Sequence, residues 1–84
     1  MTDKEQEISD KLIKIASGAF RVPPNTLNLN ITYQDLETWD SLAHLNLFLS
    51  LEEEFQINFS TGEITQLFSL KDILNNILEK LNNS

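Results

Sequence analysis

The chain has 84 residues, and a core of this size buries only around 60% of the surface that the unfolded chain exposes, so residues 1–84 are expected to form a single domain. With 40% hydrophobic and 23% charged residues, the composition excludes disordered and collagen-like classes, and the absence of Cys excludes disulfides, Cys-based zinc sites and a thiol nucleophile. The net charge of −7 repels phosphate backbones and anionic lipids, which argues against nucleic acid as a partner.

A first helix is predicted over residues 3–20. Apolar residues recur there at steps of three and four, which places them on one face of a helix. These residues are Ile8, Leu12, Ile15, Ala16, Ala19 and Phe20. Pro23 and Pro24 prevent the helix from continuing, because proline lacks the amide proton and disfavours helical backbone in the residue before it.

Residues 21–39 are predicted to form a long connection. This segment is rich in Asn but contains six large apolar residues, namely Leu27, Leu29, Ile31, Tyr33, Leu36 and Trp39. A loop with so many apolar groups is expected to lie against the core. Residues 27–31 alternate like a strand, but a single strand has no partner with which to pair, so we predict a loop.

A second helix is predicted to begin at Asp40, whose carboxylate can accept from the amides of the first turn, and to run through Phe55. Its wheel shows two apolar arcs. The arc suited to the core holds Leu47, Phe48, Leu51 and Phe55; the other holds Leu42, Leu45 and Leu49, with Ser41 and Glu52 between the arcs. Either this helix is buried on more than one side, or it carries an exposed apolar patch bordered by carboxylates.

Two further helices are predicted after residue 59. The sequence Ser-Thr-Gly-Glu at residues 60–63 is a capping box that opens a short third helix through about Leu67, and residues 69–72 have a related pattern that opens a fourth. The fourth helix has an apolar stripe of Ile73, Leu74, Ile77, Leu78 and Leu81. The predicted fold class is all-α: a small four-helix bundle with three main helices, one short third helix and a long loop after the first helix.

The charges are unevenly distributed along the chain. Residues 1–21 and 71–84 each sum to zero, so the whole net charge lies in residues 22–70, which contain no Lys or Arg. This acidic middle is either a solvated surface or a docking face for basic partners, since complementary charge accelerates encounter.

The start of the second predicted helix and its acidic end resemble a known family. The string Asp40-Ser41-Leu42, then Leu45, Leu49 and the acidic run at residues 51–55, closely resemble the acyl carrier protein family, and the resemblance covers essentially the whole chain. In that family the matching serine, here Ser41, is the attachment point of 4′-phosphopantetheine, which a separate phosphopantetheinyl transferase takes from coenzyme A. The resemblance implies a non-catalytic carrier of acyl thioesters in fatty-acid, polyketide or related biosynthesis.

The resemblance also implies a docking face on the second helix. The matching positions are Asp40, Leu42, Leu45, Leu49, Glu52 and Glu53. The implied partners are the phosphopantetheinyl transferase and acyl ligases, synthases or transferases with basic docking patches. Because residues 1–5 are polar and no apolar run approaches the roughly 20 residues that cross a bilayer, we expect a cytoplasmic protein without membrane insertion. We also expect the protein to be a monomer.

Three positions depart from the pattern of the family's fatty-acid members. Thr38 and Trp39 stand where those members commonly carry Gly and a small residue, and Asn46 stands where they commonly carry an acid. A bulky aromatic beside the arm is expected to alter which enzymes fit, and one partner-facing charge is missing.

His44 and the acidic run suggest other chemistry that we do not predict. His44 lies three residues from Ser41 and four from Asp40, but one exposed helix without oxyanion donors does not make a hydrolase, so no catalytic residue is predicted. We expect His44 on the surface, paired with Asp40. Residues 52–54 lack the ligand spacing and central Gly of an EF-hand, so no metal site is predicted.

Two alternative functions remain open at this point. One is an aminoacyl or peptidyl carrier of nonribosomal synthesis or cell-wall modification. The other is an unmodified helical adaptor that uses the same acidic and apolar face for protein binding alone. The adaptor predicts that Ser41→Ala leaves function intact, whereas a carrier would lose it.

Overall fold

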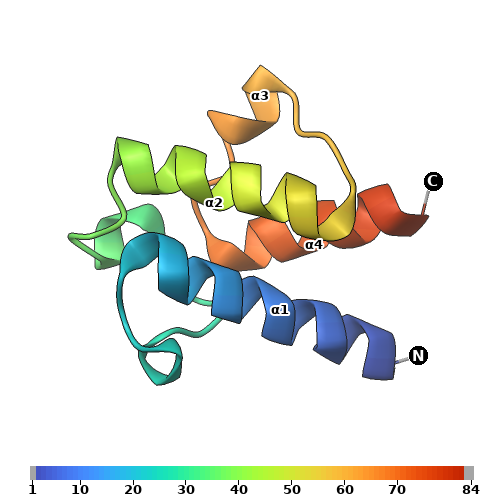
Figure 1. The fold of residues 1–84 in the computed structure, drawn as a ribbon, viewed down its shortest axis with the longest axis horizontal. Helices are drawn as coiled ribbons and strands as arrows, with labels where there is room; N and C mark the ends of the chain where they lie inside the picture. Colours follow the sequence, from blue (N-terminus) through green and yellow to red (C-terminus); the bar gives the residue numbers. More distant parts are fainter. Residues whose placement is uncertain (1, 83–84) are drawn as a thin grey trace.

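Three longer helices pack side by side, and a fourth, very short helix lies at their edge in the computed structural model (Figure 1). The structure describes residues 2–82; the remaining positions of the predicted domain, residues 1 and 83–84, lie outside the described residues. The helices are α1 (Thr2–Phe20), α2 (Ser41–Phe55), α3 (Thr61–Ile64) and α4 (Leu70–Asn82). Helices α1 and α2 run in opposite directions, and the described residues form no strand, so the prediction of an all-α bundle is confirmed.

Helix α1 contributes one buried side chain per turn to the core. Ile8, Leu12, Ala16 and Phe20 are buried at steps of four residues, as the apolar pattern predicts. The helix ends at Phe20, and the next residue, Arg21, has a left-handed backbone (φ 58°). The amide of Val22 donates to the Ser17 carbonyl at 3.2 Å. This bond satisfies a carbonyl that the end of a helix leaves without a partner.

The long connection lies against the core, as predicted. Leu27 and Trp39 are buried, and two short 3-10 helices, Pro24–Thr26 and Tyr33–Asp35, break up the loop. The segment that alternates like a strand stays a loop, but it does find a backbone partner. The Tyr33 amide donates to the Phe68 carbonyl at 2.8 Å, and the Leu70 amide donates to the Ile31 carbonyl at 3.1 Å. The connection is therefore tied to the start of α4.

Helix α2 begins and ends where the sequence predicts. The Asp40 carboxylate accepts from the Ala43 amide at 2.8 Å, which caps the helix. Most of the predicted core arc is buried, including Leu47, Phe48 and Leu51, while Phe55 is half-buried at the C-terminal end.

Helix α3 forms from the predicted capping box but is shorter than predicted. The Ser60 hydroxyl accepts from the Glu63 amide at 3.1 Å, and the Glu63 carboxylate accepts from the Ser60 amide at 2.8 Å. The helix ends at Ile64 instead of about Leu67, because the next turn tightens: the Gln66 amide donates to the Glu63 carbonyl at 3.1 Å. In α4 the predicted stripe faces the core, with Ile73, Leu74 and Ile77 buried and Leu78 and Leu81 half-buried.

Candidate functional site

Ser41 is exposed at the first helical position of α2. The side chain that caps this helix is Asp40, so the Ser41 hydroxyl is not needed as a cap and makes no hydrogen bond to any other part of residues 2–82. The first amides of a helix have no intrahelical acceptor, and the helix dipole places partial positive charge there. The local environment of Ser41 is therefore an accessible hydroxyl at a position that favours an anionic substituent.

An open groove of about 730 Å³ begins at Ser41. We call it the Ser41 groove. Its walls come from the second half of the long connection, from the chain around α3 and from the first turn of α4. The lining residues are Thr32, Tyr33, Gln34, Ser41, His44, Ile64, Thr65, Gln66, Phe68, Ser69 and Asp72. Most of these side chains can form hydrogen bonds, and the carboxylate among them is that of Asp72.

The second apolar arc of α2 is exposed, which decides between the two interpretations of this helix. Leu42 is 68% exposed, Leu45 46% and Leu49 53%. Glu53 is also exposed and lies one turn beyond Leu49. We call Leu42, Leu45, Leu49 and Glu53 the leucine face. An apolar group of this kind beside a carboxylate is typical of a surface that binds another protein.

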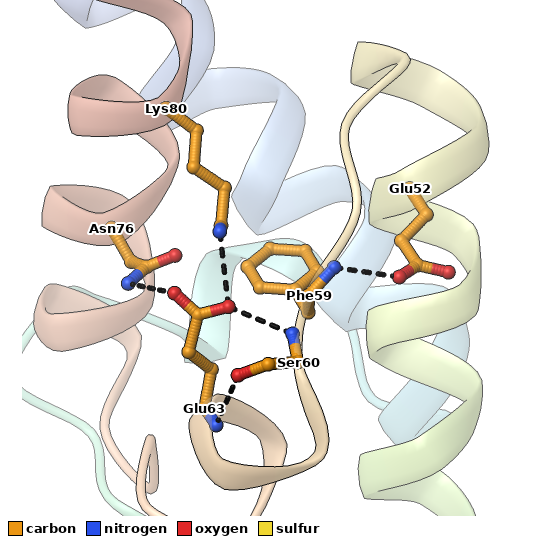
Figure 2. Close-up of polar contacts among 6 residues, drawn as sticks. All are labelled: Glu52, Phe59, Ser60, Glu63, Asn76 and Lys80. Atoms are coloured by element: carbon orange, nitrogen blue, oxygen red, sulfur yellow. Dashed lines mark hydrogen bonds and ion pairs between the residues drawn. The ribbon is translucent and has the colours of Figure 1, made fainter. Parts of the chain in front are cut away.

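Glu52 has an internal partner that the sequence did not indicate. It is half-buried, and its Oε2 accepts from the Phe59 amide at 2.8 Å (Figure 2). This hydrogen bond holds the chain that leaves α2. Glu52 thus lies at the edge of the leucine face with one carboxylate oxygen already bonded, whereas Glu53 is exposed.

Basic side chains from α1, and from Arg21 directly after it, lie beside α2. Lys11, Lys14 and Arg21 line a second groove together with Leu42 and Asn46. Lys11 Nζ lies 3.5 Å from the Glu54 carboxylate. Sequence reasoning missed this arrangement because residues 1–21 sum to zero charge; the three- and seven-residue spacing of these cations was the available signal.

His44 is not a surface residue paired with Asp40, so that prediction is wrong. It is 6% exposed; its Nδ1 accepts from Trp39 Nε1 at 2.9 Å, and its Nε2 lies 2.6 Å from the Ile64 carbonyl oxygen. On the helix wheel His44 falls in the core arc with Phe48 and Leu51, which explains its burial. Trp39 is 1% exposed and stacks on Phe20, so it does not form an exposed wall beside Ser41.

Glu63 links α3 to α4 (Figure 2). Besides the Ser60 amide, its carboxylate accepts from Lys80 Nζ at 3.0 Å and from Asn76 Nδ2 at 3.1 Å. The hydrogen bond from the Ser60 backbone, followed by that from Lys80, lowers the pKa of Glu63 from its usual 4.5 to about 2. This carboxylate is therefore occupied within the fold.

Two kinds of site are not formed by the described part of the chain. Residues 2–82 contain no group of three His, Asp or Glu side chains placed to hold a metal ion. None of the described helices combines the length and apolar character needed to cross a membrane.

Comparison with known proteins identifies the fold. No protein-family model matches the chain. Among solved structures, the chain is similar to a holo acyl carrier protein from Geobacter metallireducens whose structure was determined by NMR in solution. The two share 32% sequence identity over 89% of this chain and 86% of that chain, with a TM-score of 0.78. The four-helix architecture is thus that of a small carrier domain. The chain belongs to the acyl carrier protein family, as the resemblance around Asp40-Ser41-Leu42 implies.

Proposed function

We propose that this protein carries acyl groups as thioesters on a 4′-phosphopantetheine arm attached to Ser41. The observation that carries the proposal is the Ser41 hydroxyl, which is exposed at the start of α2 while Asp40 performs the capping. Membership of the acyl carrier protein family, and similarity to a holo member, support the same assignment.

The residues around Ser41 fit such a group. The phosphate of the arm would lie at the N-terminus of α2, an arrangement worth about 0.3–1 kcal/mol at an exposed position. In the Ser41 groove, Gln34 and Gln66 offer donors and acceptors for the amides of the arm. The hydroxyl protons of Thr32 and Thr65 are donated within the fold, so these two side chains offer acceptors only. When bound, the arm supplies the thiol that the chain itself lacks, since the sequence contains no Cys.

The chain's own part in attachment is to present a nucleophile. Ser41 Oγ would form a new bond to the phosphorus next to pantetheine as the P–O bond of the coenzyme A pyrophosphate breaks. Adenosine 3′,5′-bisphosphate would be the leaving group, and the serine proton would pass to the transferase. His44 does not serve as the base, because Nδ1 already accepts from Trp39 and Nε2 is bonded to the Ile64 carbonyl. Both bonds would have to break first. The proposal is therefore a carrier that performs no catalysis.

Docking is assigned to the leucine face, with Asp40 and Glu52 at its edges. The exposed leucines supply apolar contact, and Glu53 supplies charge that attracts basic patches on the transferase and on acyl-transferring enzymes. A carrier must bind several enzymes in turn and leave each one. Fast encounter with modest affinity suits this requirement.

Modification of Ser41 is the direct test. Wild-type protein incubated with coenzyme A and a phosphopantetheinyl transferase should gain one phosphopantetheine by intact-mass spectrometry, and Ser41→Ala should gain none. Ser50→Ala is the matched control, because Ser50 is another exposed serine on α2 and its loss should leave modification unchanged. A wild-type chain that stays unmodified would favour the unmodified adaptor.

Loading assays with acyl and aminoacyl ligases then separate an acyl carrier from an aminoacyl carrier.

A further inference from the structure

The groove on the α1 side of α2 has a volume of about 740 Å³, and we call it the basic groove. It lies between α1 and α2, which pack against each other in opposite directions (Figure 1). Two stripes of side chains at helical spacing line it: Lys11, Lys14, Gly18 and Arg21 from α1 and the residue after it, and Leu42, Asn46, Ser50 and Glu54 from α2. Because the helices are antiparallel, Arg21 lies at the end of the groove where α2 begins, and Lys11 lies at the other end beside Glu54.

The basic groove carries more positive than negative charge on a protein whose net charge is −7. Both of its carboxylates are engaged, since Asp40 caps α2 and Glu54 lies 3.5 Å from Lys11 Nζ. Lys14 and Arg21 are exposed, and neither side chain forms an ion pair or a hydrogen bond with the rest of residues 2–82. Two cations are therefore available to a ligand.

Between the charged side chains, the basic groove is lined by apolar and small residues. Ile15, Ala19, Leu42 and Ala43 contribute apolar surface. A Cβ at Gly18 would meet no atom within 4 Å beyond its immediate neighbours and its own helix backbone. Ala would fit there and is the better helix former, so packing does not require this glycine. The groove thus leaves open space against the backbone of α1, where another chain can approach closely.

The spacing of the two free cations favours a peptide segment as the occupant. Lys14 and Arg21 are seven residues apart, which corresponds to two helical turns or roughly 10 Å along the axis. This spacing suits two carboxylates placed two turns apart on another helix better than one small anion, which binds best between converging cations. A membrane or nucleic acid presents negative charge over a wide area and would also meet the exposed carboxylate of Glu53. A second copy of this chain would bring another net charge of −7.

We propose that the basic groove binds an amphipathic helix of a partner protein, whose carboxylates contact Lys14 and Arg21 and whose apolar side chains lie over Gly18 and Leu42. The apolar contact supplies affinity, and the two charges fix the orientation of the helix. Leu42 belongs to both the basic groove and the leucine face, so the bound helix would lie next to the proposed docking surface. The assignment does not depend on an arm, and Ser41→Ala should bind the helix as well as the wild-type protein does.

The probe for this test is a synthetic amphipathic peptide of about 18 residues, roughly 27 Å long as a helix. It carries Glu at seven-residue spacing along one edge and Leu and Ala on the adjoining face; in the control peptide, Gln replaces every Glu. Each peptide is titrated into full-length, isotope-labelled protein. We expect the Glu peptide to shift the amide resonances of Gly18, Ala19, Ala43 and Asn46. Its Kd from fluorescence anisotropy should be about fivefold lower than that of the Gln peptide.

Three variants locate the contact. Lys14→Gln combined with Arg21→Gln should weaken binding of the Glu peptide about fivefold. Lys4→Gln combined with Lys71→Gln is the matched control, because it changes the net charge equally at exposed lysines outside the groove, and it should stay within about twofold. Gly18→Leu should fill the groove and abolish the shifts there, while circular dichroism shows that the helices are retained. The charge variants decide the matter if this variant does not fold.

Several outcomes would overturn the assignment: no shifts with the Glu peptide, shifts confined to Leu45 and Leu49, equal affinity for the two peptides, or equal losses in the two double variants. Sedimentation of the protein alone and with phosphatidylglycerol vesicles tests the other occupants. Self-association or vesicle binding that only the groove variants abolish would assign the groove to a second copy or to a membrane instead. A chain that binds the Glu peptide in the groove but never takes up an arm would support this inference and overturn the proposed function.

Discussion

Gln56 ends α2 with a left-handed backbone (φ 55°), a conformation that L-residues other than Asn and Asp adopt only at some cost. Glycine has no Cβ and adopts it freely, which is why Gly is preferred after the last residue of a helix. Gln56→Gly should therefore raise the free energy of unfolding by about 0.5–1 kcal/mol, after the greater flexibility of Gly in the unfolded chain is subtracted. Urea denaturation followed by circular dichroism measures the change.

A matched control for this variant lies in α4. Asn75 is exposed within a helix, so Asn75→Gly introduces the same residue where no left-handed conformation is required. It should destabilise the protein by a few tenths of a kcal/mol, given the helix propensities of the two residues. Destabilisation by Gln56→Gly would contradict the argument that backbone strain is stored at this position.

At the scale of single residues, the sequence predicts some features of the site and not others. Asp40 as a cap and Ser41 as an exposed hydroxyl are predictable, because both depend on interactions within one helical turn. The bonding of His44 is not, because one of its partners is the carbonyl of Ile64, twenty residues away. Its burial could have been read from the helix wheel, where it shares the arc of Phe48 and Leu51.

At the scale of elements, α3 is too short to be stable by itself, and Glu63 connects it to α4. The folded pKa of Glu63 is about 2, against 4.5 for an ordinary glutamate. A carboxyl whose folded pKa is depressed stabilises the fold fully above its unfolded pKa and loses that contribution as the pH falls through the folded pKa. The contribution of Glu63 should thus be constant above about pH 5 and decline between about pH 4.5 and pH 2.

Thermal unfolding from pH 7 to pH 2 measures this contribution. Glu63→Gln should lower the free energy of unfolding by about 1 kcal/mol at pH 7, since it loses the charge that Lys80 and the Ser60 amide stabilise. The difference from wild type should shrink as the pH falls to 2. Glu79→Gln is the control, because Glu79 is exposed on α4 and should change stability little. A difference that persists unchanged at pH 2 would contradict the assignment.

The sequence predicts the individual helices better than it predicts the contacts between segments. The helix boundaries reflect prolines, caps and apolar periodicity, all of which are local. The pairing of Tyr33 with Phe68, and of Ile31 with Leu70, joins segments more than thirty residues apart. An alternating segment alone does not identify such a partner, because every residue except proline has the same backbone donor and acceptor.

At the scale of the whole molecule, folding brings basic side chains from both ends of the chain next to acids of residues 22–70, the segment that holds the whole net charge. Lys11 contacts Glu54 on one side of α2, and Lys80 contacts Glu63 on the side of α3 and α4. Two acids of the acidic middle are thereby partnered, and Glu52 bonds the Phe59 amide. Glu53 remains exposed beside Leu49, so the leucine face has a carboxylate available to an incoming basic partner.

Reversing the charge at Glu53 tests whether this placement, and not net charge alone, governs docking. Glu53→Lys and Glu79→Lys each change the net charge by two units from −7, but only Glu53 lies on the leucine face. We expect Glu53→Lys to lower kcat/KM for modification of Ser41 by a phosphopantetheinyl transferase about threefold to fivefold, as for a rim charge worth up to about 1 kcal/mol. Glu79→Lys should stay within about twofold, and salt at about 0.5 M should reduce the difference by screening. Equal losses in both variants would show that partners respond to the overall field, and the leucine face would then lose its assignment as the docking surface.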